Sequence, residues 1–91
     1  MATVEIFSSP GCGYCERAKQ RLAAKGIAYV YLYIAGDDKH RAELLRRLPR
    51  ARALPQIFID GEHIGGFDDL CLLDETGRLE ALTGGKGLSS Q

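Results

Sequence analysis

Short apolar runs alternate with longer amphipathic segments along this chain. The runs at Thr3–Phe7 and Ile27–Ile34 are rich in β-branched and aromatic residues, which favours strands. Between them, Cys12–Lys25 carries apolar residues at helical spacing, and Gly26 follows as a C-terminal cap. This strand–helix–strand order predicts two parallel strands joined by a right-handed crossover.

A second helix is predicted after the turn at residues 35–38. Asp37 or Asp38 can cap its first turn, because a carboxylate accepts hydrogen bonds from the free N–H groups of a helix start. We expect the helix to run to about Leu48, because Pro49 cannot continue it. A loop over residues 50–54 then leads to the next extended segment.

The last third of the chain predicts a β-hairpin followed by helix. Gln56–Ile59 and Glu62–Ile64 flank Asp60–Gly61, a pair typical of tight hairpin turns. A helix is expected from near Asp68, with a short last turn at Arg78–Leu82. The whole order predicts an α/β fold with a four-stranded mixed β-sheet flanked by helices on both faces.

The length, charge and composition of the chain mainly argue against certain classes of partner and location. A chain of 91 residues makes one domain, expected at residues 1–83, followed by a flexible tail at 84–91 that lacks core-forming residues. Twelve basic and twelve acidic residues balance, so charge gives no reason to expect nucleic acid or a membrane surface as partner. No membrane-length apolar run or signal-type leader precedes the first strand, so we expect a cytoplasmic location.

The chemistry of the chain is concentrated in two cysteines, Cys12 and Cys15, at a predicted strand-to-helix junction. The free N–H groups and the dipole at a helix start stabilise a thiolate, so Cys12 is expected to ionise readily and act as a nucleophile. Cys15 lies three residues further on the same helix face and can close a disulfide onto it. This arrangement is typical of a thiol–disulfide redox site.

Zinc is the main alternative for the cysteine pair. A structural zinc site needs four ligands, and the chain adds only Cys71, His40 and His63, without a repeated spacing. We expect no metal site, and we expect Cys71 to be a buried apolar filler on the last long helix. A basic run near the end of the second helix is interpreted first as a solvated face and second as a partner-docking surface. The run comprises Arg46, Arg47, Arg50 and Arg52.

Three motifs together resemble the glutaredoxin family, in particular its small bacterial dithiol members of the glutaredoxin 3 branch. They are Cys12-Gly13-Tyr14-Cys15, the segment Ala53–Ile59 and the segment Gly65–Leu70, and the likeness extends from about Val4 to Leu82. The resemblance implies a thioredoxin-like fold. It also implies an enzyme, a glutathione-dependent thiol–disulfide oxidoreductase that reduces protein–glutathione mixed disulfides and protein disulfides.

The resemblance assigns roles to the two cysteines. Cys12 would take glutathione from a glutathionylated protein, and a second glutathione would release it as oxidised glutathione, which the glutathione reductase system recycles. For a protein disulfide, Cys15 would attack the intermediate formed at Cys12. The implied partners are glutathione and glutathionylated or disulfide-bonded proteins, with ribonucleotide reductase as a family-level expectation, and the implied state is a monomer.

The resemblance also implies a set of glutathione contacts. Tyr14 would border the site, and Leu54, before a cis Pro55, would pair its backbone with the cysteinyl part of glutathione. Asp68 and Asp69, at a helix start, would hold the γ-glutamyl end. A glycine-rich step before them permits close approach of the ligand.

The chain departs from the family pattern at two places. Ser8 and Ser9 stand where a lysine is common before the first cysteine. The resemblance implies that Arg41, which matches a second family position, contacts the glycyl carboxylate of glutathione, with Lys19 as a weaker substitute. Gly13 stands where proline is common, and some relatives with small residues there bind a [2Fe–2S] cluster between two protomers through their first cysteine, here Cys12. A cluster-binding carrier or sensor is therefore one alternative function, and a redoxin supplied by a thioredoxin-type reductase is another.

Overall fold

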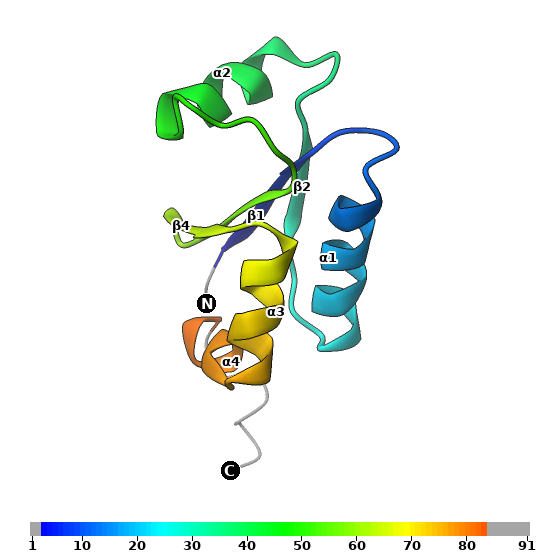
Figure 1. Ribbon diagram of the computed structural model, residues 1–91, viewed down its shortest axis with the longest axis vertical. Coiled ribbons are helices and arrows are strands. Elements are labelled where there is room, and N and C mark those ends of the chain that lie inside the picture. The colour runs from blue at the N-terminus through cyan, green and yellow to red at the C-terminus, as the bar shows by residue number, and fades with distance from the viewer. Residues whose placement is uncertain (1–2, 84–91) are drawn as a thin grey trace.

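A computed structural model of the chain describes residues 3–83 and contains one four-stranded sheet with helices on both faces (Figure 1). The strands are β1 (Val4–Ser8), β2 (Val30–Tyr33), β3 (Gln56–Ile59) and β4 (Glu62–Gly65). The helices are α1 (Gly13–Ala24), α2 (Asp38–Arg47), α3 (Phe67–Glu75) and α4 (Arg78–Leu82). Among the described residues, no helix has the length and apolar character needed to cross a membrane. The predicted tail at 84–91 lies outside the described residues.

The sheet confirms the mixed topology expected from the sequence. Its strand order is β2-β1-β3-β4, with β1 parallel to β2 and antiparallel to β3, which pairs antiparallel with β4. The strand predicted at Ile27–Ile34 was too long, because Ile27 still bonds to the last turn of α1: its N–H donates to the carbonyl of Leu22. Gly26 provides the positive φ of 73° that this helix ending requires, as the sequence predicted.

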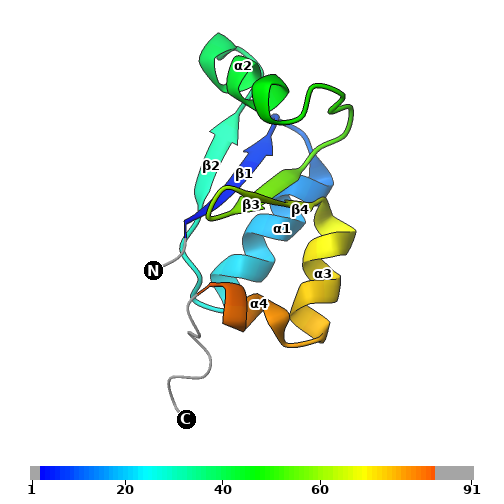
Figure 2. The ribbon, with the colours of Figure 1, turned by 90° about the vertical axis from the view of Figure 1, so that its left-hand side faces the viewer.

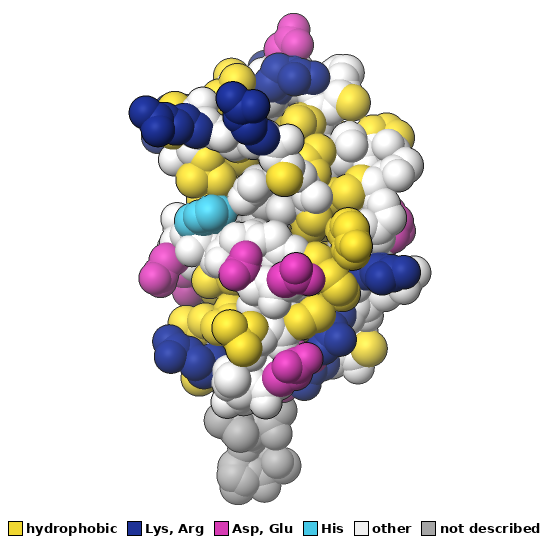
Figure 3. Space-filling view, viewed as in Figure 1, with side chains coloured by type: hydrophobic (Ala, Val, Ile, Leu, Met, Phe, Trp, Pro, Cys, Tyr) yellow, Lys and Arg dark blue, Asp and Glu magenta, His cyan; other side chains and the backbone are white. Residues whose placement is uncertain are grey.

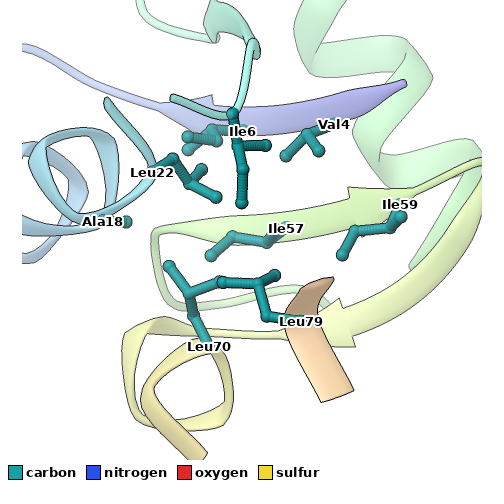
Figure 4. Close-up of a cluster of buried hydrophobic side chains, with 9 residues drawn as sticks. Val4, Ile6, Ala18, Leu22, Ile57, Ile59, Leu70 and Leu79 are labelled. Atoms are coloured by element: carbon teal, nitrogen blue, oxygen red, sulfur yellow. The ribbon is translucent and has the colours of Figure 1, made fainter. Parts of the chain in front are cut away.

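Successive side chains of β1 and β3 point to opposite faces of the sheet, so their apolar residues are divided between two hydrophobic cores. Val4 and Ile6, with Ile57 and Ile59, point to the face that α1, α3 and α4 cover (Figure 4). The helices contribute Ala18, Leu22, Leu70 and Leu79 to this cluster.

The other face carries a smaller core beneath α2. Phe7 and Phe58 meet edge to face with ring centroids 5.7 Å apart, and Leu44 packs against them. Figure 2 shows α2 apart from α1 and α3, which lie side by side.

Local signals fix the ends of several elements. Asp37 caps α2 by accepting hydrogen bonds from the N–H groups of Lys39 and His40, at 3.0 and 3.2 Å. Asp60 and Gly61 both have positive φ, 52° and 82°, as a two-residue hairpin turn requires. These features agree with the sequence, whereas α3 begins at Phe67, one residue earlier than expected, with Gly66 as its N-cap.

Ion pairs join α1 to the last two helices. Asp74 on α3 accepts from Arg21 and Lys25 of α1, and Lys25 also reaches Glu80 on α4. Burial raises the pKa of Asp74, but the hydrogen bonds from Lys25 and Arg21 outweigh it and leave the pKa below its usual value. The hydrogen bond from Lys25 likewise lowers the pKa of Glu80. These pairs join the last turn of α1 to α3 and to α4, which lies at the opposite end of the molecule from α2 (Figure 1).

Candidate functional site

The two cysteines lie where the sequence predicted, at the start of α1. Cys12 is the N-cap residue and is half-buried, whereas Cys15 is fully buried, and the two form a disulfide. The backbone N–H of Cys15 donates to the Sγ of Cys12 at 3.1 Å. A helix N–H aimed at this sulfur favours its thiolate form in the reduced protein. The geometry therefore makes Cys12 the accessible sulfur and Cys15 the internal one.

A pocket of about 290 Å³ opens beside the cysteine pair. Five of its lining residues are those that the resemblance implied: Tyr14, Leu54, Pro55, Asp68 and Asp69. They come from three segments of the chain, the start of α1, the loop before β3 and the start of α3. The Leu54–Pro55 peptide bond is cis. The fold thus brings together residues that lie more than fifty positions apart in the sequence.

The two aspartates of this pocket have different surroundings. Asp69 accepts a hydrogen bond from the N–H of Gly66 at 3.0 Å and so closes the first turn of α3. Asp68 is exposed and forms no hydrogen bond or ion pair with any other residue in the range 3–83. Its carboxylate is therefore the one available to a ligand cation.

Sequence reasoning missed three further residues that line the pocket: Ala53, Gln56 and Phe67. The ring of Phe67 lies 5.8 Å from that of Tyr14, which is 57% exposed, so the two aromatics form one wall. The position of Phe67 between the glycine step and the aspartates was the available signal, and its ring also packs against the edge of the main core.

The predicted cation lies outside this pocket. Arg41, exposed on α2, lines an adjoining hollow that shares Ala53 and Leu54 with the pocket. Ser8 is fully buried at the end of β1, and Ser9 is half-buried. Of the two serines, only Ser9 therefore leaves room near the surface for the lysine that the family pattern places there.

The prediction for Cys71 was wrong in its burial. Its side chain is half-buried and its thiol is free. The neighbouring Leu70 is the residue of α3 that is fully buried in the core, so Cys71 lies to one side of the buried face of the helix.

Within residues 3–83 there is no group of three or more His, Cys, Asp or Glu side chains that could hold a metal ion.

The sequence and the structure of this chain are both similar to those of known proteins of one family. The glutaredoxin family model matches residues 4–64 of the chain. Glutaredoxin 3 of Escherichia coli K12 is 48% identical over 82 residues, which cover 90% of this chain and 98% of that protein. Glutaredoxin of Pseudomonas aeruginosa is 42% identical over 82 residues, which cover 90% of this chain and 96% of that protein.

A solved structure of similar fold is the buckwheat glutaredoxin–glutathione complex. It superposes with a TM-score of 0.78 at 31% identity, covering 92% of this chain and 78% of that chain. A family model over most of the chain, a bacterial relative nearly half identical and a cysteine pair at a helix start agree with one another. The chain therefore belongs to the glutaredoxin family and is a thiol–disulfide oxidoreductase of thioredoxin-like fold.

Proposed function

We propose that this protein uses glutathione to reduce protein–glutathione mixed disulfides and protein disulfides. The observation that carries the proposal is the pairing of a half-exposed Cys12 with a buried Cys15 beside the Tyr14-lined pocket. The complex of buckwheat glutaredoxin with glutathione supports it, because that relative has the same fold.

In the proposed reaction the Cys12 thiolate attacks the glutathione sulfur of a mixed disulfide. A bond forms between Cys12 and glutathione, and the protein substrate leaves as a thiolate that takes up a proton. A second glutathione thiolate then attacks the glutathione sulfur, which frees Cys12 and yields oxidised glutathione. For a disulfide within a protein, such as that of ribonucleotide reductase, the Cys12 thiolate attacks one sulfur and the other sulfur leaves as a thiolate that takes up a proton. The Cys15 thiolate then attacks the sulfur of Cys12, which breaks the Cys12–substrate bond, releases the second substrate thiolate and leaves the Cys12–Cys15 disulfide. Two glutathione molecules reduce this disulfide and leave as oxidised glutathione.

The pocket residues are proposed to position glutathione for these steps. The N–H groups at the start of α3 would bind the γ-glutamyl carboxylate, and the unpaired carboxylate of Asp68 would bind its ammonium group. The backbone of Leu54 would pair with the cysteinyl residue, with Tyr14 and Pro55 bordering it and Asp69 holding the helix start in place. The glycyl carboxylate would extend towards Arg41 in the adjoining hollow.

A coupled assay tests the proposal. The protein is mixed with glutathione, glutathione reductase, NADPH and the mixed disulfide of glutathione with a small thiol, and NADPH loss is followed. We expect Cys12→Ser to be inactive and Cys15→Ser to keep activity, because this route needs only the first sulfur. Equal activity of both variants would refute the roles, and activity that needs thioredoxin reductase in place of glutathione would refute glutathione dependence.

A further inference from the structure

The basic run around the end of α2 separates into two groups in the folded chain. Arg46 and Arg47 are paired with Glu43, and their hydrogen bonds lower the pKa of that carboxyl to about 2. Arg47 also donates to Glu5 and lies over the ring of Phe58, 4.8 Å from its centroid. Arg47 is thus part of the packing between α2 and the sheet, whereas Arg46 is exposed and its ion pair lies within α2.

The other two arginines of the run, Arg50 and Arg52, are exposed and form no ion pair with any residue between 3 and 83. They line a groove of about 510 Å³ on the loop between α2 and β3. Its remaining walls are mostly apolar, from Leu48, Pro49, Ala51 and Ala53, and no acidic residue of the described range 3–83 lines it. We name this feature the arginine groove.

The arginine groove is continuous with the pocket beside the cysteines, because Ala53 and Gln56 line both. The side chain of Gln56 is fixed at this junction by two hydrogen bonds. Its amide nitrogen donates to the carbonyl of Ala53 at 2.9 Å, and its oxygen accepts from His63 at 2.7 Å. A polypeptide whose cysteine lies at Cys12 can therefore continue along the surface into the groove.

Charge changes sign along this path. Asp68 and Asp69 lie at the end beside α3, and the arginines lie at the end beside α2. In Figure 3 one group of Lys and Arg side chains lies over α2 at the upper end of the face, whereas most acidic side chains lie lower, where further basic side chains are interspersed with them. The two unpaired guanidinium groups beside apolar walls complement a segment that carries carboxylates and small apolar side chains.

We propose that the arginine groove docks an acidic segment flanking the target cysteine of a disulfide-bonded substrate protein, an inference that rests on the function proposed above. The balanced net charge of the chain and the aspartates at the other end of the path favour a polypeptide over a nucleic acid. The chain's own residues 84–91 cannot supply the segment by charge, since they contain a lysine and no acidic residue.

The test compares peptide disulfides that differ only in charge. A short peptide with one cysteine is flanked by glutamates, glutamines or lysines and oxidised to its symmetrical disulfide, and its reduction is followed with glutathione, glutathione reductase and NADPH. We expect KM to be about three- to tenfold lower for the glutamate peptide than for the glutamine peptide, as two exposed charge pairs allow. The preference should shrink as salt is raised from about 0.01 M to about 1 M.

Arginine variants test whether the preference for the glutamate peptide depends on the arginine groove. Arg50→Gln combined with Arg52→Gln should remove it, whereas Arg78→Gln, an exposed arginine on α4 at the far end of the molecule, should keep it (Figure 1). The wild type, Arg78→Gln and the single variant Arg50→Gln should reduce the small glutathione mixed disulfide at the same rate, because Arg50, unlike Arg52, does not line the hollow beside Arg41. Equal KM values for glutamate and glutamine peptides in the wild type would overturn the docking proposal.

Two further outcomes separate the possible failures. If the wild type does not reduce the small mixed disulfide, the proposed function itself has failed. If a short single-stranded DNA inhibits peptide reduction through Arg50 and Arg52 and a cysteine-free glutamate peptide does not, the groove binds nucleic acid and the docking proposal is wrong. Inhibition by the glutamate peptide alone supports it.

Discussion

Replacing Gly65 by alanine should destabilise the start of α3 far more than replacing its neighbour Gly66. Gly65 is the buried last residue of β4 and has φ of +127°, a backbone region that L residues rarely adopt. A Cβ there would overlap the carboxylate and the Cβ of Asp69, and rotation of the carboxylate cannot relieve the second overlap. Gly66 has φ of −97°, and a Cβ there would meet only the carbonyl of Pro55 at 3.5 Å.

The expected loss in the free energy of unfolding of Gly65→Ala has two contributions. A strained backbone costs about 1–3 kcal/mol, and loss of the hydrogen bond between Asp69 and Gly66 costs about 0.5–2 kcal/mol, as for other helix caps. We therefore expect Gly65→Ala to lower the free energy of unfolding by about 2–4 kcal/mol. A chain of this length has about 5–13 kcal/mol in total, so the variant should still fold.

Urea unfolding of the oxidised protein, followed by far-UV circular dichroism, measures this loss. Gly66→Ala should change the free energy of unfolding by less than about 1 kcal/mol. Combining Gly65→Ala with Asp69→Ala should cost less than the sum of the two single changes, because one carboxylate is no longer in the way. If Gly65→Ala equals Gly66→Ala, or if the double variant is additive, the reasoning from steric overlap is refuted.

Three other predictions concern the core, the pH dependence and the reactive sulfur. Leu44→Ala, in the core beneath α2, should cost about 2–4 kcal/mol in urea unfolding, whereas Leu45→Ala, 43% exposed on the same helix, should cost less than about 1 kcal/mol; equal losses would contradict the assigned packing. Asp74 has a pKa lowered in the folded state, so its contribution to stability is present above the ordinary carboxyl pKa and is lost as pH falls through the folded value. The urea midpoint of the wild type should therefore fall on acidification below about pH 4, and the fall should be smaller in Asp74→Asn; an identical pH profile would rule out this linkage. Ser9→Lys should lower the pKa of the Cys12 thiol, measured as thiolate absorbance against pH in the reduced protein, and an unchanged midpoint would show that a lysine there does not act on the sulfur.

The sequence by itself determined the features that depend on neighbouring residues. The order of strands and helices, the cap at Asp37, the Asp60–Gly61 turn and the place of Cys12 at a helix start follow from local patterns. Backbone conformational preferences and the hydrogen bonds at helix ends act over a few residues, so a short stretch of sequence contains the information. The family likeness rests on such local motifs too.

Only the tertiary structure decided how residues distant in the sequence meet. From local patterns we expected Cys71 to be buried, but the orientation of α3, which depends on the whole fold, leaves it half-buried. The same holds for the surroundings of Asp68 and Asp69. The sequence does not distinguish these neighbouring carboxylates, and in the fold only Asp69 accepts a hydrogen bond from the N–H of Gly66.

The basic run near the end of α2 shows most clearly that charge pairing depends on the tertiary structure. The sequence does not show which of its four arginines form ion pairs, and the first interpretation was a solvated face. In the fold, Glu5 of β1 and Glu43 bind Arg47, whereas Arg50 and Arg52, on the loop after α2, form no ion pair with any residue of the described part of the chain. Pairing of charges depends on distances of a few ångströms between elements, and these distances are set by sheet register and helix packing rather than by any local pattern.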